Sequence, residues 1–335
     1  MATTADAESV ARAADTASAP QHDAPERDRQ GPATIVCVTT NPAIDITYTI
    51  DELRPGSSHR VPTGLACAGG KGVNVARVLR QQGEHALVVA PVGGPVQVLF
   101  EHDLVRSSIP HRLIEVEAPT RRTTAIVTPA GTTNLNERGE AIDPDDWRRV
   151  LDVVREEAAR ARVVVSSGSL PPETPERLCA GVVEIARAAG LPVVIDVGGA
   201  QLAHAVAAGA TAVKPNRHEL FDAMGGSDPL DAARRLAALG TGTVFASLDV
   251  EGMLAVLPDG RAWHARHDGV LDGNPTGAGD AAVAALAQAI DTRAPLEEQL
   301  ARATAWSAAA VLGRQAGEIA DPAAIAEHVR IAPIG

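Results

Sequence analysis

The stretch PTGAGD, residues 275–280, places small residues directly in front of one carboxylate, and an apolar helical pattern follows it. A loop that enters a helix offers free backbone N–H groups and the positive end of the helix dipole. Because Gly277, Ala278 and Gly279 carry little or no side chain, an anion can approach this backbone closely. The chemistry that fits is phosphoryl transfer. The N–H groups would hold the charge on the moving phosphoryl group, and Asp280 would accept the proton of the receiving hydroxyl.

Asp280 also has a plainer interpretation. A carboxylate in the first turn of a helix most often serves to stabilise that helix. Capping requires no pair of glycines, however, and Thr276 is available to cap this helix instead. The position predicts a lowered pKa for Asp280, because a helix N-terminus favours the ionised carboxylate. A lowered pKa weakens a base, but phosphoryl transfer tolerates this, since the proton moves late in a loose transition state.

The stretch KPNRHEL, residues 214–220, begins a second helix after a strand. Asn216 and Glu219 lie three residues apart, so they share a face of that helix. Oxygen ligands of this kind suit Mg²⁺, usually through its water molecules. The same pair also fits a capping box, in which each side chain binds the backbone N–H of the other residue. The residues alone support the two interpretations about equally.

The stretch AGGKGVNVAR, residues 68–77, has neither the spacing of a GxGxxG loop nor the GKS or GKT end of a P-loop. The exposed backbone at glycines and the side-chain amide of an asparagine can form hydrogen bonds with sugar hydroxyls. Gly70, Lys71 and Asn74 are therefore predicted to hold a sugar. Asp45 follows Asn-Pro at a predicted strand exit and could accept hydrogen bonds from two hydroxyls. An Asx-type turn is the alternative for Asp45.

Three arginines are the cations best placed to bind a phosphate on a substrate. Arg121 and Arg122 are adjacent, and Arg60 lies further away in the sequence. The planar fork of arginine suits phosphate, although most single arginines on a surface are simply solvated. The ten histidines include no close pair with zinc-ligand spacing, which argues against a metal hydrolase.

The elements that must position these residues follow an α/β pattern. From about Pro144 onwards, continuous apolar strands alternate with helices, which predicts a mainly parallel central sheet with helices on both faces. Right-handed crossovers put the strand exits along one edge, where ligands bind in such sheets. Strand-like segments near 46–66 and 111–136 do not fit the alternation. We expect them to form a small separate β-sheet, a lid over the site.

The length, composition and net charge of the chain limit the classes of function that it can have. The chain has 335 residues, of which 45% are apolar and 2% aromatic, so one large domain over 33–330 is expected after a disordered tail, 1–32. A net charge of −12 argues against nucleic-acid and membrane-surface binding. Three widely spaced cysteines suggest a reducing compartment, and no apolar run has the length of a membrane span. These features predict a cytoplasmic protein.

Taken together and in this order, several motifs resemble the ribokinase/PfkB family of sugar kinases. They are NPAID, AGGKGVNVAR, TRRT, LNE, SGSLPP, VIDVGG, KPNRHEL and PTGAGD. The resemblance is greatest to the phosphosugar branch, which contains 1-phosphofructokinase, tagatose-6-phosphate kinase and the minor 6-phosphofructokinase. It implies a ribokinase-like fold with a β-sheet lid, which often also forms a homodimer interface. It also implies phosphorylation of a sugar hydroxyl with ATP and Mg²⁺. Fructose 1-phosphate is the first candidate substrate, followed by fructose 6-phosphate and tagatose 6-phosphate.

The resemblance also implies roles for individual residues. Asp280 matches the catalytic base of the family, and Gly277, Ala278 and Gly279 match its anion hole. Asn216 and Glu219 match an NxxE element that governs Mg²⁺ near the phosphates. The positions that match substrate and nucleotide contacts are Asp45, Gly70, Lys71 and Asn74 for the hydroxyls, Arg121 and Arg60 for the substrate phosphate, and Ser247 and Gly252 for the nucleotide loop.

Three departures from the family pattern leave alternatives open. The nucleotide loop carries Asp249 where glycine is usual, VGGPVQ lacks the usual Thr-Gly, and LNERGE has Arg138 and Glu140 in place of two prolines. One alternative is a kinase for an unphosphorylated sugar or nucleoside. Another, which Asp249 favours, is a catalytically weak regulatory protein that binds a sugar phosphate. The presence of Asp280 argues against it, because a sensor needs no base.

Overall fold

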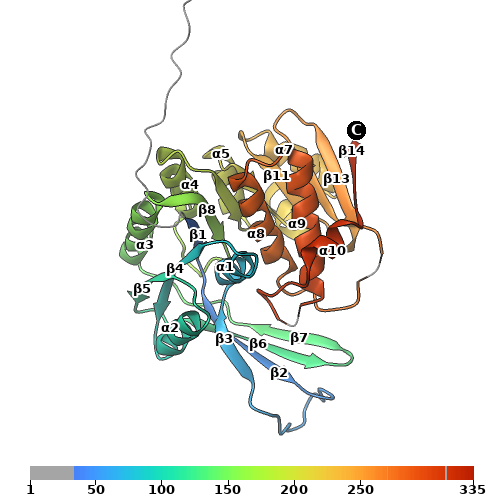
Figure 1. The fold of residues 1–335 in the computed structure, drawn as a ribbon. Coiled ribbons are helices and arrows are strands. Elements are labelled where there is room, and N and C mark those ends of the chain that lie inside the picture. The colour runs from blue at the N-terminus through green and yellow to red at the C-terminus, as the bar shows by residue number, and fades with distance from the viewer. Residues whose placement is uncertain (1–33, 270, 314) are drawn as a thin grey trace, which may run out of the picture. The chain divides into compact units, whose positions relative to one another are not determined.

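The computed structural model describes residues 34–269, 271–313 and 315–335. The tail expected over 1–32 therefore lies outside the described residues. The strands of the described part form two sheets (Figure 1).

The larger sheet has ten strands within these ranges, in the order β14-β13-β12-β11-β10-β9-β8-β1-β4-β5. The strands are β1 (Thr34–Thr39), β4 (Ala86–Gly93), β5 (His111–Val116), β8 (Ala161–Ser167), β9 (Val193–Asp196), β10 (Ala212–Val213), β11 (Thr243–Ser247), β12 (Met253–Val256), β13 (Ala262–His267) and β14 (Val329–Ile334). Neighbours from β5 to β11 are parallel, and β12 to β14 continue the sheet as antiparallel strands. The carboxyl ends of the parallel strands therefore share one edge.

Helices cover both faces of this sheet, as the alternation predicts (Figure 1). The helices are α1 (Lys71–Gln81), α2 (Gln97–Arg106), α3 (Pro144–Ala158), α4 (Leu178–Ala188), α5 (Ala200–Ala207), α6 (Arg217–Met224), α7 (Pro229–Ala237), α8 (Ala278–Asp291), α9 (Leu296–Val311), α10 (Pro322–Ala326) and the 3₁₀ turn η1 (Asp249–Glu251). Along β1, Ile35 and Cys37 enter the core shared with α1, α2, α8 and α9. Val36 and Val38 enter the core shared with α3, α4, α5 and α7.

Helix α8 carries PTGAGD at its start and is buried along most of its length. Its sequence, AGDAAVAALAQAID, is rich in alanine, which has the highest helix propensity and lets neighbouring elements approach closely. The helix packs against α9, α1 and the strands β8 and β9. This close packing explains how a chain with few aromatic residues fills its core.

The smaller sheet has the order β3-β2-β6-β7. Its strands are β2 (Ala43–Thr49), β3 (Leu65–Gly69), β6 (Arg121–Thr128) and β7 (Gly131–Asn136). The predicted lid over 46–66 and 111–136 is therefore partly wrong, because residues 111–116 form β5 at the edge of the large sheet. The reason is that β4, α2 and β5 make a parallel crossover, which buries Ile114 and Val116 in the core.

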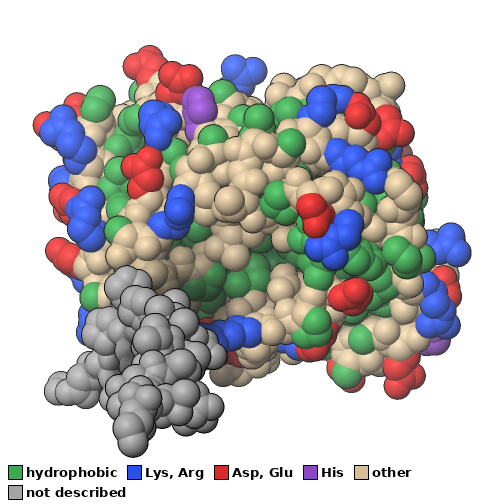
Figure 2. All heavy atoms as spheres, turned by 90° about the horizontal axis from the view of Figure 1, so that it is seen from above, with side chains coloured by type: hydrophobic (Ala, Val, Ile, Leu, Met, Phe, Trp, Pro, Cys, Tyr) green, Lys and Arg blue, Asp and Glu red, His purple; other side chains and the backbone are tan. Residues whose placement is uncertain are grey.

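Basic and acidic side chains are interspersed on the face that looks away from the small sheet, with apolar side chains between them (Figure 2). The residues described on this face thus do not gather into a basic stripe of the kind that tracks a nucleic-acid backbone. In the described ranges, the helices are too short or too polar for a membrane crossing.

Candidate active site

The start of α8 and the start of α1 meet at the carboxyl edge of the parallel strands. Nδ2 of Asn74, on α1, donates a 2.8 Å hydrogen bond to Oδ2 of Asp280, on α8. Asp280 is buried, with 6% of its surface exposed. The N-cap residue of α8 is Gly277, in the left-handed region with φ of 87°, and no side chain caps the helix. Asp280 is therefore not acting as a cap, and neither is Thr276.

Burial dominates the acidity of Asp280. Removal from water raises its pKa to about 7, and nearby Asp196 raises it too, while Lys71, Lys214 and the Asn74 amide oppose the rise. The expectation of a pKa lowered by the helix N-terminus is therefore wrong, because loss of hydration outweighs the helix dipole here. A carboxylate with a pKa near 7 is a better proton acceptor at neutral pH than an ordinary one.

Two residues that the sequence reasoning did not single out complete this charged cluster. Asp196, at the end of β9, is fully buried, and Lys214, just after β10, is 3% exposed. Nζ of Lys214 lies 3.3 Å from Oδ1 of Asp196, and Nζ of Lys71 lies 3.3 Å from Oδ2. Burial alone would raise the pKa of Asp196, but the two lysines and the Ser167 hydroxyl hold it below its ordinary value.

Lys214 also faces the small residues in front of Asp280. A Cβ added to Gly279 would lie 3.4 Å from Nζ of Lys214. An ammonium group therefore lies beside the N–H groups of the α8 N-terminus, and both favour an anion there. The sequence does hold a signal for this residue, because Lys71 and Lys214 are its only lysines among 30 basic Lys and Arg residues.

The pair Asn216 and Glu219 forms the capping box of α6. Asn216 Oδ1 accepts the N–H of Glu219, and Glu219 Oε2 accepts the N–H of Asn216, both at 2.9 Å. Oε1 of Glu219 lies 3.5 Å from Nζ of Lys71. The described residues contain no group of three or more His, Cys, Asp or Glu side chains that could hold a metal. One partly exposed carboxylate fits Mg²⁺ bound through water and substrate phosphates, which is its usual mode.

Asp45 lies within β2, rather than at a strand exit or in an Asx-type turn. Its Oδ1 accepts a 2.6 Å hydrogen bond from the Thr123 hydroxyl on neighbouring β6. A Cβ on Gly69 would lie 2.0 Å from Oδ2 of Asp45, so a side chain at that position would displace the Asp45 carboxylate. Burial raises the pKa of Asp45, and Thr123 and Arg121 partly oppose the rise. Gly70, with φ of 100°, follows Gly69 and is the N-cap residue of α1.

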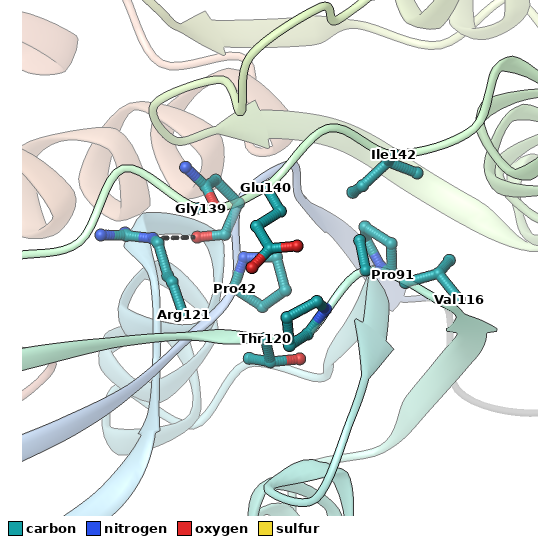
Figure 3. A pocket seen from close by; sticks show the side chains of 11 residues that line it. Pro42, Pro91, Val116, Thr120, Arg121, Gly139, Glu140 and Ile142 are labelled. Carbon is teal, nitrogen blue, oxygen red and sulfur yellow. Dashed lines mark hydrogen bonds between the residues drawn. The ribbon is translucent and has the colours of Figure 1, made fainter.

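Arg121 begins β6 and is held by backbone carbonyls. Its Nε donates to the Asn41 carbonyl at 3.3 Å, and its Nη1 donates to the Glu137 carbonyl at 3.0 Å. Burial lowers the pKa of Arg121, against the influence of Asp45 and Glu137. Figure 3 shows Arg121 on the rim of a pocket. The pocket is lined by Asn41, Pro42, Pro91, Val116, Ala118, Pro119, Thr120, Arg121, Gly139, Glu140 and Ile142.

Arg60 is not brought to Arg121 by any contact among the described residues. It is exposed in the segment that joins β2 to β3. The two predicted phosphate ligands therefore differ: the structure fixes the guanidinium of Arg121 and leaves that of Arg60 in solvent.

The predicted nucleotide loop joins the capping box. Ser247, at the end of β11, forms a parallel bridge with Asn216. Asp249 is exposed and has φ of 54°, and Gly252 has φ of 98°. A positive φ is the conformation that glycine adopts most cheaply, which explains why Asp249 is unusual there. Arg217 and Glu251 form a 2.7 Å ion pair that ties this loop to α6.

Residues 34–323 match the profile of pfkB family carbohydrate kinases. The chain belongs to this family. The 1-phosphofructokinase of Xanthomonas campestris pv. campestris is 37% identical to this pfkB kinase over 285 residues, which cover 81% of this chain and 89% of the relative.

Solved structures of pfkB kinases share the fold. Phosphofructokinase-2 from Escherichia coli, in complex with potassium, has a TM-score of 0.81 at 26% identity, covering 88% of this chain and 98% of that one. The same enzyme has been solved with fructose 6-phosphate and as a tetrameric inhibited form. Ribokinase from Arabidopsis thaliana, with ribose and ATP, has a TM-score of 0.65 at 22% identity, covering 89% and 98% of the two chains. The predicted ribokinase-like α/β fold and the predicted family are thus confirmed.

Proposed function

We propose that this pfkB kinase transfers the γ-phosphoryl group of ATP to a hydroxyl of fructose 1-phosphate, giving fructose 1,6-bisphosphate. The observation that carries the proposal is the buried Asp280 at the glycine-rich start of α8, joined by Asn74 to the predicted sugar-binding segment. The 37% identity to a 1-phosphofructokinase supports fructose 1-phosphate as the substrate. Fructose 6-phosphate and tagatose 6-phosphate are the next candidates.

In the proposed reaction, the sugar hydroxyl oxygen forms a bond to the γ-phosphorus while the bond from that phosphorus to ADP breaks. The bonding electron pair leaves with ADP, and the hydroxyl proton passes to the Asp280 carboxylate. The backbone N–H groups around Gly277, Ala278 and Gly279, together with Lys214, stabilise the negative charge on the moving phosphoryl group. Asp45, Gly70, Lys71 and Asn74 orient the sugar, so that its hydroxyl faces Asp280.

The remaining predicted site residues are assigned to the phosphate of the sugar, to the nucleotide and to Mg²⁺. Arg121 binds the phosphate already on the sugar, and Arg60 is the second candidate for that role because the segment that carries it borders the small sheet. Ser247 and Gly252 contact the nucleotide. Asn216 and Glu219 hold Mg²⁺ through its waters, and Mg²⁺, when bound, neutralises charge on the ATP phosphates.

We also propose a homodimer through the small sheet. Tyr48, Ile126 and Leu135 lie on its face opposite Asp45, because they alternate with the residues of the site face. Leu135 is 59% exposed in the single chain. An apolar sheet face of this kind favours association with a second copy. Light scattering on the purified protein tests this, and a monomer at micromolar concentration would contradict it. The three free cysteines fit the proposed cytoplasmic location.

The experiment that tests the activity is ATP consumption with Mg²⁺ against fructose 1-phosphate, fructose 6-phosphate, tagatose 6-phosphate, fructose and ribose. We expect the highest kcat/KM with fructose 1-phosphate. Preference for fructose or ribose would contradict the assignment of a phosphosugar. Binding of a sugar phosphate without turnover would contradict the kinase itself and favour the regulatory alternative that Asp249 suggests.

A further inference from the structure

The strand β3 has an open edge where the small sheet meets the body of the protein. It is the terminal strand of that sheet and pairs with β2. A terminal strand leaves backbone N–H and C=O groups unpaired on its outer side. At Ala68 both groups are nevertheless bound by side chains. The N–H donates to Oδ2 of Asp103 at 2.9 Å, and the C=O accepts from Nη2 of Arg77 at 3.0 Å.

Arg77 and Asp103 also form an ion pair with each other. The Arg77 side chain is 14% exposed and the Asp103 side chain 4%. Arg77 is on α1 and Asp103 on α2, so the pair joins two helices and the edge of β3 at one point. Burial alone would raise the pKa of Asp103, but the Ala68 N–H and the arginines Arg77 and Arg106 hold it below its ordinary value.

The residues next to this ion pair belong to the proposed site. Ala68 immediately precedes Gly69, which borders Asp45, and Gly70, which is the N-cap residue of α1. On α1, Arg77 lies one helical turn after Asn74, the hydrogen-bond partner of Asp280. The pair therefore binds the segment that would hold the sugar, and Arg77 shares a helix with the residue that contacts the base.

The same arginine packs against a segment that reaches the start of α8. A Cβ added to Gly317 would lie 2.8 Å from Cδ of Arg77 and 3.4 Å from Cα of Asn74. A Cβ added to Gly277 would lie 2.9 Å from Cα of Ala316, the residue before Gly317. Arg77 thus packs against residues 316–317, and this segment in turn packs against the start of α8, which carries Asp280.

We propose that Arg77 and Asp103 are positioning residues, which hold the sugar-binding turn of β3 at a fixed place relative to Asn74 and Asp280. The inference rests on the proposed function of that site. A buried ion pair contributes little net stability compared with apolar residues of similar size. What this pair provides, and apolar side chains would not, is a bond to each backbone group of Ala68.

The test compares Asp103→Asn and Arg77→Lys with Arg106→Ala. Arg106 is 68% exposed on its side chain and binds Oδ1 of Asp103 at 2.8 Å from the solvent side. Arg106→Ala is therefore a control that removes one contact of Asp103 and leaves its bond to Ala68. Steady-state kinetics are measured for the phosphosugar and for ATP separately, with circular dichroism to check folding.

We expect KM for the phosphosugar to rise about 10- to 100-fold in Asp103→Asn, because a neutral amide with one acceptor oxygen cannot keep the charged bonds to Arg77 and Ala68 at full strength. KM for ATP should stay within about twofold of the wild type, because the contacts of Asp103 are with Ala68, Arg77 and Arg106, and none of these residues is proposed to bind the nucleotide. Arg77→Lys keeps the positive charge but loses the planar, forked guanidinium group, so the KM of this variant for the phosphosugar should also rise. Arg106→Ala should match the wild type in both constants.

Folded Asp103→Asn protein with an unchanged KM for the phosphosugar would overturn the inference, as would an equal rise in KM for both substrates. Asp103→Asn is nearly isosteric, so it carries the test even where Arg77→Lys fails to fold. A wild-type protein that phosphorylates none of the sugars would overturn the proposed function, and this inference with it. Wild-type turnover with normal variants overturns the inference alone.

Discussion

Nζ of Lys71, at the start of α1, lies 3.3 Å from Oδ2 of Asp196, at the end of β9. Nζ also lies 3.5 Å from Oε1 of Glu219 on α6. Burial alone would lower the pKa of Lys71, but Asp196, Glu219 and Asp280 together raise it, so the side chain stays protonated. A fixed ammonium group therefore connects the proposed sugar-binding segment to the proposed phosphate-binding residues.

Asp280→Asn should lower kcat by about 10²–10⁴, the usual scale for a positioned general base. Substrate binding should change little, because asparagine has nearly the same shape and can still accept from Asn74. Turnover assays and calorimetric binding of ATP and the phosphosugar measure the two effects. Asp272→Asn is the matched control, since it neutralises an exposed carboxylate in the same loop. Near-normal turnover of Asp280→Asn would remove Asp280 from the mechanism.

The pH dependence of kcat/KM should follow Asp280. The base works in its ionised form, and its pKa is raised to about 7. Hence kcat/KM for the phosphosugar should be low at pH 5 and 6 and rise through about pH 7, since this constant reports groups of the free enzyme. A profile that is already flat from pH 5 upwards would contradict the raised pKa. Assays in overlapping buffers of constant ionic strength measure it.

The free energy of unfolding should also depend on the titration of Asp280, but it should fall as pH rises, whereas kcat/KM rises. The pKa of Asp280 is about 7 in the folded protein against an ordinary 3.8, so the unfolded chain loses this proton first as pH rises. Its stabilising contribution is complete below about pH 4 and is lost by pH 8. The free energy of unfolding of Asp280→Asn should therefore exceed that of the wild type at pH 8 by an amount on the order of a few kcal/mol. Urea unfolding at pH 8 measures the difference, and a variant less stable than the wild type would contradict it.

Lys71→Met should move the rise in kcat/KM to higher pH. The positive charge of Lys71 lowers the pKa of Asp280, so its removal leaves burial and Asp196 less opposed. Lys71→Arg keeps the charge and serves as the matched variant, in which the rise should stay closer to pH 7. Equal shifts in the two variants would show that the shape of the side chain, rather than its charge, sets the pKa of Asp280.

Arg121→Ala should raise KM for the phosphosugar about 10- to 100-fold and leave kcat with saturating substrate much less changed, because it removes a charge-assisted bond to phosphate. Arg122→Ala is the control: the neighbouring residue of β6 points to the other face of the sheet. Similar effects in both variants would indicate a general loss of positive charge instead of a phosphate contact. Arg60→Ala, measured alongside, tests the second candidate.

Asp249→Gly should lower KM for ATP several-fold. The substitution removes a negative charge from the proposed nucleotide loop and suits the φ of 54° at this position. Initial rates over a range of ATP concentrations measure the change. A raised KM for ATP would show instead that the Asp249 carboxylate contributes to nucleotide binding.

The local features of this protein could be predicted from its sequence. Glycines before Asp280, the strand–helix alternation and the order of the motifs are properties of neighbouring residues. They indicated the fold, the family and the segments that form the site. The Asn216–Glu219 capping box was also predictable, as one of two alternatives, because both of its hydrogen bonds span only three residues.

The tertiary structure decided which distant residues meet. Asn74 and Asp280 form one hydrogen bond from different helices, and the pKa of Asp280 rises because folding removes its water, which outweighs the local helix dipole. Sequence reasoning misses Asp196 and Lys214 as site residues because Asp196 ends one short buried strand and Lys214 directly follows another. Only the parallel sheet brings those strand ends together. Burial and long-range charge contacts depend on packing, so no local pattern contains them.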